Sequence, residues 1–299
     1  MSGSRYGAEA PTRPPGGAPE RVGVLGGGRM GAGIAHAFLL AGSHVTVVER
    51  DEAAAEAARG RVLDSVAASV ARGTTDETAE ALGARLGVAT DVDGFDGAGL
   101  VVEAVPEDLD LKLDALTRVE AVLAADAALA SNTSSISIDE LAGRLDRPGR
   151  FLGLHFFNPV PASALVEVVR GTGTEGALVE EARGWVQAIG KTPIIVHDAP
   201  GFASSRLGVA LGLEAIRMLE EGVASAEDID AAMALGYRHP VGPLKLTDLV
   251  GLDVRLGIAE YLAGELGDRF EPPALLRRMV AEGKLGRKTG EGFYLWDAQ

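Results

Sequence analysis

Residues 21–50 read RVGVLGGGRMGAGIAHAFLLAGSHVTVVER, and this stretch decides the expected fold. A short apolar run, Val22–Leu25, passes through three glycines into a helical pattern, and a β-branched run follows at His44–Val48. Two such runs joined by a helix are typical of a βαβ unit with parallel strands. Further apolar runs recur at Leu100–Val102, Ala127–Ala130, Phe151–Leu154, Leu165–Val169 and Pro193–Val196. The sequence therefore predicts a mainly parallel, doubly wound sheet.

Helical patterns between these runs supply the covering layers. They lie near residues 29–42, 52–72, 76–86, 108–124 and 175–190. The pattern changes at the Pro200-Gly201 pair, which interrupts any regular element, and no strand-like run follows before the extreme C-terminus. We therefore expect an α/β fold: a disordered tail over 1–20, a Rossmann-type doubly wound sheet over 21–199 and an all-α domain over 200–299.

The expected all-α domain begins with an unusually apolar helix. Residues 203–221 are apolar on nearly every side, which is typical of a helix buried in a core or at a subunit interface. Ser225 then opens a capping box with Asp228, and Gly236 ends that helix. Further helical patterns lie near 243–266 and 273–282.

Composition narrows the class of protein. The 299 residues include 28 Lys and Arg against 43 Asp and Glu, a formal charge of −15, which argues against a nucleic-acid partner. An anionic ligand would need a local positive site on this acidic background. The chain has no cysteine, so we expect neither disulfides nor a thiolate metal site, and a cytoplasmic location fits. No apolar run reaches the length of a membrane span.

The glycine loop after the first strand predicts a dinucleotide site. Gly26, Gly28 and Gly31, with Arg29 and Met30 between them, fit the pattern G-x-G-x-x-G and open the first helix. Glycine permits the tight turn and lets a pyrophosphate approach the free N–H groups of the helix. Glu49 closes the second strand, where a carboxylate can bind both ribose hydroxyls and repel a 2′-phosphate. These residues predict NAD rather than NADP, although Arg50 could soften the preference.

A histidine and a carboxylate form the candidate catalytic pair. His155 ends the strand that begins at Phe151, and Glu167 lies within the apolar strand Leu165–Val169. A carboxylate inside a buried strand is costly unless a partner holds it. Neighbouring strands would bring Glu167 against His155, giving a pair suited to general acid–base catalysis of alcohol oxidation. A core histidine bonded to a backbone carbonyl is an equally open interpretation.

Several polar groups near these strands are further candidates. Four hydroxyls fall within Ser131-Asn-Thr-Ser-Ser135, which could cap a helix or donate to a substrate hydroxyl or the cofactor ribose. Lys112 and Lys288 could each neutralise phosphate, or could be ordinary solvated lysines.

Five stretches in order and in register resemble the L-3-hydroxyacyl-CoA dehydrogenase family. They are Gly26–Gly31, Glu103–Asp108, Ser131–Ser135, His155–Pro159 and Gly286–Tyr294. The resemblance implies NAD-dependent, reversible oxidation of a short-chain L-3-hydroxyacyl-CoA, as in fatty acid metabolism, by a homodimer formed through the helical domain. It also implies a set of roles. His155 and Glu167 would be catalytic, Ser134 and Asn158 would hold the reacting oxygens, and Glu49, Glu107, Lys112, Ser134, Asn158 and Lys288 would line the NAD site beyond the glycine loop.

Two departures from the family pattern bear on the substrate. Ser205 stands where the family usually has an asparagine near the substrate, and a serine is shorter. The helical stretch after Glu52 carries few lysines, which leaves Arg72 as a candidate phosphate contact for coenzyme A. Two alternatives therefore stay open: an oxidoreductase for a carrier-bound hydroxyacyl group or a free hydroxy or sugar acid, and a nucleotide-binding protein without catalysis.

Overall fold

The computed structural model describes residues 17–297 and divides the chain into two compact units, Met1–Asp198 and Ala199–Gln299. Most of the expected disordered tail, residues 1–16, lies outside the described residues. Within residues 17–20, the Pro19 carbonyl accepts a hydrogen bond from Ser43 and the Glu20 carbonyl accepts one from the His44 N–H.

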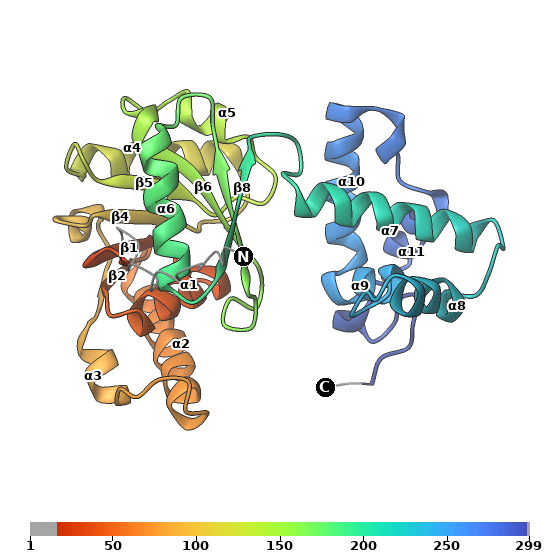
Figure 1. Cartoon of the computed structure of the whole chain (residues 1–299), viewed down its shortest axis with the longest axis horizontal. Helices are drawn as coiled ribbons and strands as arrows, with labels where there is room; N and C mark the ends of the chain where they lie inside the picture. Colours follow the sequence, from red (N-terminus) through yellow and green to blue (C-terminus); the bar gives the residue numbers. More distant parts are fainter. Residues whose placement is uncertain (1–16, 298–299) are drawn as a thin grey trace, which may run out of the picture. The chain divides into compact units, whose positions relative to one another are not determined.

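The first unit is built on one eight-stranded sheet in the order β3-β2-β1-β4-β5-β6-β7-β8 (Figure 1). The strands are β1 Arg21–Leu25, β2 His44–Val48, β3 Leu86–Ala89, β4 Leu100–Glu103, β5 Ala128–Ser131, β6 Phe151–Phe156, β7 Leu165–Arg170 and β8 Thr192–His197. All neighbouring pairs are parallel except β6 and β7, which are antiparallel. The chain reverses its direction of winding between β1 and β4, and such a switch point is where doubly wound sheets bind ligands.

Helices flank this sheet and bury its apolar faces. They are α1 Arg29–Leu40, α2 Glu52–Ala71, α3 Ala79–Ala84, α4 Leu109–Val122, α5 Ile138–Ala142 and α6 Gly176–Ala188. A continuous core joins α1, α2 and α6 to the strands, with Ile34, Val62 and Trp185 among its buried side chains. The prediction of a doubly wound α/β sheet is confirmed.

Three details of the sheet unit differ from the sequence prediction. The helix expected up to residue 86 ends at Ala84, and Leu86–Ala89 forms the edge strand β3 beside β2. Pairing with β2 overrides the weak strand preference of a segment that contains Gly87 and Ala89. The short helix α5 also escaped the sequence patterns, because it has only five residues and is defined mainly by the Ser137 cap.

The second unit is all-α apart from isolated bridges near its end, as predicted (Figure 1). Its α-helices are α7 Ser204–Glu220, α8 Ala226–Ala231, α9 Pro243–Val250, α10 Leu252–Leu266 and α11 Ala274–Ala281. The single helix expected over 243–266 is in fact two, because Gly251 adopts φ +108 between α9 and α10. A separate core, which includes Leu213, Leu244 and Leu262, holds these helices together.

Candidate active site

A cavity of about 1050 Å³ opens above the carboxyl ends of β1, β2 and β4. Its walls include Leu25 at the end of β1, Val48 at the end of β2 and Ala104 just after β4. It therefore lies at the switch point of the sheet, where an open α/β fold binds a dinucleotide. Gly26, Gly28, Arg29, Met30 and Glu49 of the predicted cofactor set all line it.

The glycines of the loop have distinct structural reasons. Gly26 adopts φ +90, and a Cβ there would lie 2.9 Å from the Ala104 carbonyl oxygen. A Cβ on Gly31 would lie 1.8 Å from the Gly26 carbonyl oxygen, so α1 could not pack against the loop. A Cβ on Gly28 would meet no atom within 4 Å, and Gly28 lines the cavity at the start of α1. Gly26 and Gly31 shape the turn, whereas Gly28 leaves room for a phosphate beside the helix N-terminus.

Glu49 follows the last residue of β2 and faces the same cavity. Its Oε1 accepts a hydrogen bond of 2.8 Å from the Gly27 N–H, and its Oε2 accepts one of 3.2 Å from the Arg50 N–H. These bonds fix the carboxylate beside the loop, where it can meet a ribose. The Arg50 side chain is 84% exposed and pairs with Asp51, so a competing attraction for a 2′-phosphate is weak.

Two arginines of the cavity wall were not singled out as cofactor residues from the sequence. Arg61 on α2 donates a hydrogen bond of 2.9 Å to the Gly27 carbonyl oxygen, and Arg118 on α4 lies 3.8 Å from Asp114. No motif marks either residue, because each reaches the cavity only through the packing of its helix on the sheet. Together they place positive charge beside a site for an anionic cofactor in an acidic protein.

Lys112 is buried behind the cavity. Its side chain is 1% exposed, and its ammonium group donates to Glu103 Oε1 at 2.7 Å and to the Val105 carbonyl oxygen at 3.2 Å. The other carboxylate oxygen of Glu103 accepts a hydrogen bond of 2.5 Å from Ser131. The charge of Lys112 is thus matched inside the protein, and its direct role here is to fix the ends of β4 and β5.

Glu107 organises the serine loop that follows β5. Its Oε1 accepts hydrogen bonds from the hydroxyls of Thr133, Ser134 and Ser135 and from the N–H groups of Ser134 and Ser135, at 2.7–3.2 Å. Burial opposes ionisation of this carboxyl, but the charge of Lys112 and these donors outweigh burial and hold the pKa of Glu107 below its usual value. The carboxylate therefore fixes the loop that presents Ser134.

The β6–β7 register brings His155 and Glu167 together. The two residues are direct partners across the antiparallel pair, and His155 Nδ1 lies 2.7 Å from Glu167 Oε2. Glu167 is fully buried and His155 is 6% exposed. Because a carboxylate only accepts, Nδ1 carries the hydrogen and Nε2 is left as the basic nitrogen. The Phe157 ring lies 4.5 Å from the imidazole, measured between ring centroids, and restricts its position.

Strand direction places these groups at one edge of the sheet. β5 and β6 are parallel to β1 and β4, so the serine loop and His155 lie at the carboxyl edge that also carries the cavity. Asn158 is exposed just beyond β6, two residues after Phe156. The structure therefore gathers the glycine loop, Glu49, Ser134, His155 and Asn158 along one edge.

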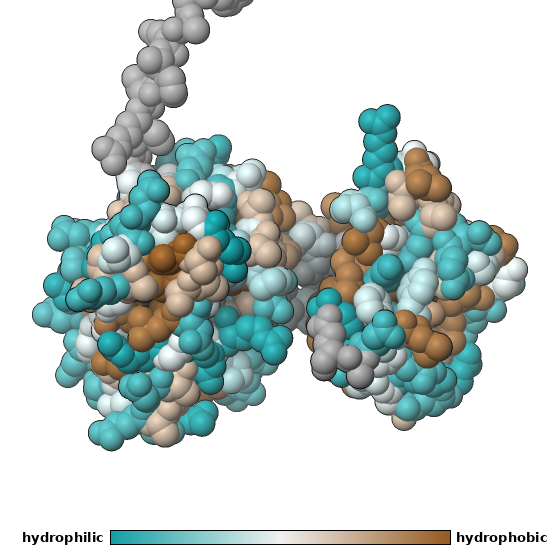
Figure 2. Space-filling model, turned by 90° about the horizontal axis from the view of Figure 1, so that it is seen from below, coloured by the Kyte–Doolittle hydropathy of each residue, from teal (hydrophilic) through white to brown (hydrophobic). Residues whose placement is uncertain are grey.

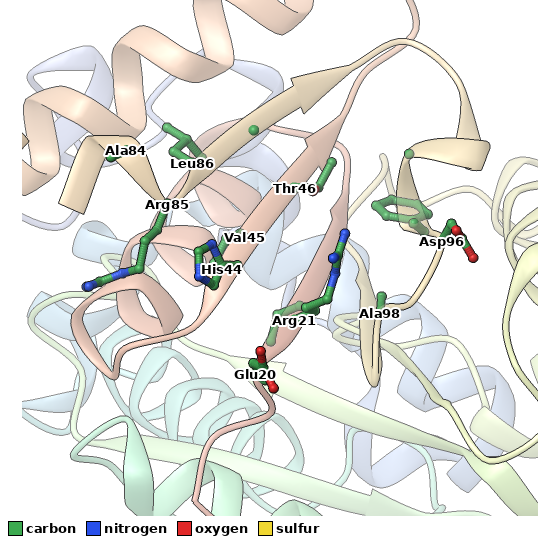
Figure 3. A pocket seen from close by; sticks show the side chains of 15 residues that line it. Glu20, Arg21, His44, Val45, Thr46, Ala84, Arg85, Leu86, Asp96 and Ala98 are labelled. Carbon is green, nitrogen blue, oxygen red and sulfur yellow. The ribbon is translucent and has the colours of Figure 1, made fainter. Parts of the chain in front are cut away.

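A second pocket lies at the opposite edge (Figure 3). It is lined by residues at the amino ends of β1, β2 and β3, including Arg21, His44 and Leu86. The Arg85 guanidinium there is already paired with Glu77 at 2.7 Å. The amino edge of a parallel sheet is not where such folds bind their ligands, so we assign no role in catalysis to this pocket.

Three of the predicted site residues do not line the cavity at the switch point. Lys288 of the helical unit pairs with both carboxylate oxygens of Asp253 at 2.6 Å. Ser205 is half-buried in the first turn of α7. Arg72 is exposed at the C-cap of α2, and α2 begins twenty residues earlier beside the cavity.

The C-terminal stretch Gly286–Tyr294 folds back onto α9. Buried Asp248 accepts hydrogen bonds from the N–H groups of Phe293 and Tyr294 and from the Trp296 indole, at 2.8–2.9 Å. A Cβ on Gly292 would lie 2.2 Å from Asp248 Oδ1, which explains the glycine. Much of this motif therefore closes the helical unit rather than contacting a ligand.

Comparison with known proteins agrees with this architecture. Residues 21–199 match the family model described as "3-hydroxyacyl-CoA dehydrogenase, NAD binding domain", and residues 201–296 match "3-hydroxyacyl-CoA dehydrogenase, C-terminal domain". The chain belongs to the 3-hydroxyacyl-CoA dehydrogenase family. The predicted family, the dehydrogenase class and the NAD cofactor are thereby confirmed.

Individual relatives match over nearly the whole chain. A 3-hydroxybutyryl-CoA dehydrogenase of Mycobacterium tuberculosis is 44% identical over 282 residues, which cover 93% of this chain and 98% of that protein. A probable 3-hydroxybutyryl-CoA dehydrogenase of Deinococcus radiodurans is 41% identical, over 92% of this chain and 99% of that protein. The crystal structure of the (S)-3-hydroxybutyryl-CoA dehydrogenase of Ralstonia eutropha superposes with a TM-score of 0.89 at 40% identity, covering 94% and 100% of the two chains. Within residues 17–297, no helix is long and apolar enough to span a membrane.

Proposed function

We propose that this protein is an NAD-dependent dehydrogenase of short-chain L-3-hydroxyacyl-CoA thioesters, acting reversibly. One observation carries the proposal: a buried His155–Glu167 pair stands at the same sheet edge as a dinucleotide cavity in a chain of this family. The names of the two 3-hydroxybutyryl-CoA dehydrogenases described above support a four-carbon acyl chain. A cytoplasmic location, expected from the cysteine-free composition, completes the proposal.

His155 acts as the base in this mechanism. Its imidazole takes the proton of the 3-hydroxyl, and the reverse reaction returns that proton to the ketone oxygen. Bound NAD would supply the acceptor for the hydride that leaves the carbon bearing this hydroxyl. The Glu167 carboxylate at 2.7 Å holds the imidazole in one tautomer and stabilises the imidazolium that proton transfer creates.

Ser134 and Asn158 position the reacting oxygens. The Ser134 hydroxyl donates to Glu107 Oε1, which accepts four further hydrogen bonds from neighbouring groups. Ser134 can therefore turn its hydroxyl to a substrate without leaving the Glu107 carboxylate unsatisfied. Asn158 is exposed at the same edge and offers an amide donor. Both groups stabilise charge on the substrate oxygen as the proton moves.

The cofactor set follows from the cavity. The glycine loop with Arg29 and Met30 would hold the pyrophosphate, Glu49 would bind the adenosine ribose, and Arg61 and Arg118 would add positive charge, since all of these residues line the cavity. Glu107 and Lys112 contribute by fixing the loops around the cofactor. The family resemblance keeps Lys288 as a proposed cofactor residue and Ser205 as a proposed substrate residue. Arg72 is proposed to contact a phosphate of coenzyme A, and an unchanged KM for the thioester in Arg72→Ala would exclude that contact.

A homodimer through the helical unit is part of the proposal. Among the described residues, nine large apolar side chains are exposed, and eight of them belong to the helical unit. Leu207 on α7, Leu246 and Val250 on α9 and Val254 on α10 lie on helices that pack against one another. Figure 2 shows apolar surface on this unit. Monomeric proteins rarely leave such area uncovered, so a second copy is the favoured occupant. Light scattering at micromolar concentration should give twice the chain mass of 30.8 kDa, and a monomer would contradict the dimer.

The test of the activity uses acetoacetyl-CoA with NADH and, separately, NADPH. Loss of reduced-nicotinamide absorbance should be rapid with NADH and should fall by at least about 100-fold in His155→Ala. His44→Ala, an exposed histidine on β2, is the matched control and should retain activity. No turnover with either cofactor, in protein that still binds NADH, would contradict a coenzyme A thioester substrate.

A further inference from the structure

The loop between β6 and β7, residues 157–164, directly follows the strand that carries His155. Its first residue, Phe157, packs on the His155 ring, and the next, Asn158, is exposed. The Asn158 side chain makes no hydrogen bond to any other residue in the range 17–297. The position of its amide is therefore set by the loop backbone, and a contact between Asn158 and a substrate oxygen depends on what fixes that backbone.

Two groups from distant parts of the sheet unit fix this loop. Val160 is buried and lies against Gly33 of α1, where a Cβ would come within 2.7 Å of the Val160 Cβ. The ammonium group of Lys191 donates to the Val160 carbonyl oxygen at 2.6 Å and to the Ser163 carbonyl oxygen at 2.5 Å. One side chain thus ties the middle of the loop to its end, two residues beyond Asn158.

The backbone of Lys191 is itself held in place. Lys191 follows α6, and the preceding Gly190 adopts φ +73. The Lys191 N–H donates to the Val186 carbonyl oxygen at 3.0 Å, which closes the helix in a Schellman motif. The next residue, Thr192, begins β8, and its N–H donates to the Ala164 carbonyl oxygen at 2.6 Å. Lys191 therefore reaches the loop from a fixed point between a helix end and a strand start.

The ammonium group of Lys191 is committed to this loop. Lys112 and Arg150 of the same unit pair with carboxylates, whereas no carboxylate of the described chain pairs with Lys191. The residue is half-buried, and burial lowers the pKa of its ammonium group. Hydrogen bonds from a charged donor are stronger than neutral ones, so the two carbonyl contacts hold the loop more firmly than a neutral side chain could.

We infer that Lys191 is a positioning residue for the dehydrogenase reaction: by binding the Val160 and Ser163 carbonyls, it holds the loop so that the Asn158 amide meets the reacting oxygen of the substrate. This inference rests on the proposed function, in which Asn158 stabilises charge on that oxygen. Lys191 acts through the loop backbone and does not contact the substrate. A displacement of about 1 Å at a group of this kind can lower the rate about 100-fold. The loss belongs in kcat, because charge on the oxygen develops in the transition state.

The experiment is a double-mutant cycle in the NADH-dependent reduction of acetoacetyl-CoA. Lys191→Met removes the ammonium group and keeps an unbranched side chain, and it should lower kcat by about 10- to 100-fold with KM changed by less than about threefold. Asn158→Ala should lower kcat by about 100-fold. In protein that already carries Asn158→Ala, Lys191→Met should cost at most about a further twofold, because the group that it positions is gone. Losses that multiply would show independent action and overturn the inference.

Two controls separate positioning of Asn158 from a general loosening of the fold. Arg183→Met alters an exposed residue of α6 whose partner is Glu180 on the same helix, and it should keep kcat. The Kd of NADH in Lys191→Met should stay within about twofold of the natural value, since the cofactor cavity lies at the ends of β1, β2 and β4. A rise in this Kd as large as the loss of kcat would mean general loosening and would overturn the inference.

Each remaining outcome is also decisive. Unchanged kcat in Lys191→Met overturns the inference and leaves the proposed function standing, and so does unchanged kcat in Asn158→Ala. If Lys191→Met does not fold, Lys191→Gln takes its place in the cycle, because its neutral amide cannot give a charge-assisted hydrogen bond. Failure of the natural protein to reduce any thioester would overturn the proposed function and this inference with it.

Discussion

Replacing Glu167 with glutamine tests the centre of the proposed mechanism. The substitution keeps the size of the side chain and an oxygen that accepts from His155 Nδ1, but it removes the negative charge. In the structure the two side chains meet at 2.7 Å, with Glu167 fully buried. The variant therefore isolates the electrostatic contribution of Glu167 from its contribution to orientation.

The expected loss of kcat follows from this geometry. The imidazolium formed during oxidation and the carboxylate have charge centres about 4 Å apart, worth about 4 kcal/mol at an effective dielectric constant of about 20. Each 1.36 kcal/mol is about a factor of ten in rate, so the upper limit is about a 1000-fold loss of kcat. The retained hydrogen bond offsets part of this loss. We expect Glu167→Gln to lower kcat by about 100- to 1000-fold.

The assay follows NADH formation from NAD and L-3-hydroxybutyryl-CoA, the direction in which the imidazolium forms, and determines kcat and KM separately. KM should change little, because Glu167 contacts His155 rather than the substrate in the proposed arrangement. Glu120→Gln is the matched control, since Glu120 on α4 is also a buried glutamate but accepts from the backbone N–H groups of Asp146 and Arg147 and pairs with the Arg147 side chain. The control should retain kcat even if its Tm falls.

The reasoning would be refuted by a Glu167→Gln variant that folds with a normal Tm and keeps kcat within about fivefold of the natural protein. In that case the charge beside His155 would not stabilise the transition state, and the carboxylate would be only an orienting group.

Three further predictions follow from individual contacts. Glu49→Gln should raise the ratio of NADPH to NADH activity by about tenfold, because one charge facing a 2′-phosphate is removed, and an unchanged ratio in steady-state kinetics would exclude that role. Lys112→Met should destabilise the protein by about 3–5 kcal/mol in urea unfolding by leaving Glu103 unpaired, and adding Glu103→Gln should recover part of the loss. Burial, then the charges of neighbouring Arg72 and Lys191, lower the pKa of His36 below 6.5, so the folded state favours neutral imidazole. The stability that this neutral His36 contributes is complete above pH 6.5 and declines as the pH falls toward the lower pKa of the folded state. His36→Gln should flatten that part of the plot of Tm against pH. A plot identical to that of the natural protein would contradict the prediction.

Local sequence patterns were sufficient to predict most strands and helices of the sheet unit. The Val22–Leu25 run, the glycine loop and Glu49 are close in sequence, and their meaning depends on neighbours only a few residues away. A strand that ends in glycines and opens a helix has few alternative folds, so the cavity at the switch point was predictable. The edge strand Leu86–Ala89 was not, because its conformation depends on pairing with β2 rather than on its own composition.

The sequence by itself determined the fold class, the glycine loop with its acidic ribose contact, and the residue types available for acid–base chemistry. The tertiary structure decided which of these groups meet. Only the antiparallel β6–β7 register sets Glu167 against His155, and only packing buries Lys112 on Glu103. Packing of α10 on α7 likewise sets the Arg255 guanidinium against Gly208. Periodicity reports the local conformation of a segment, whereas the partner of a buried charge is set by strand register and helix packing between segments distant in the chain.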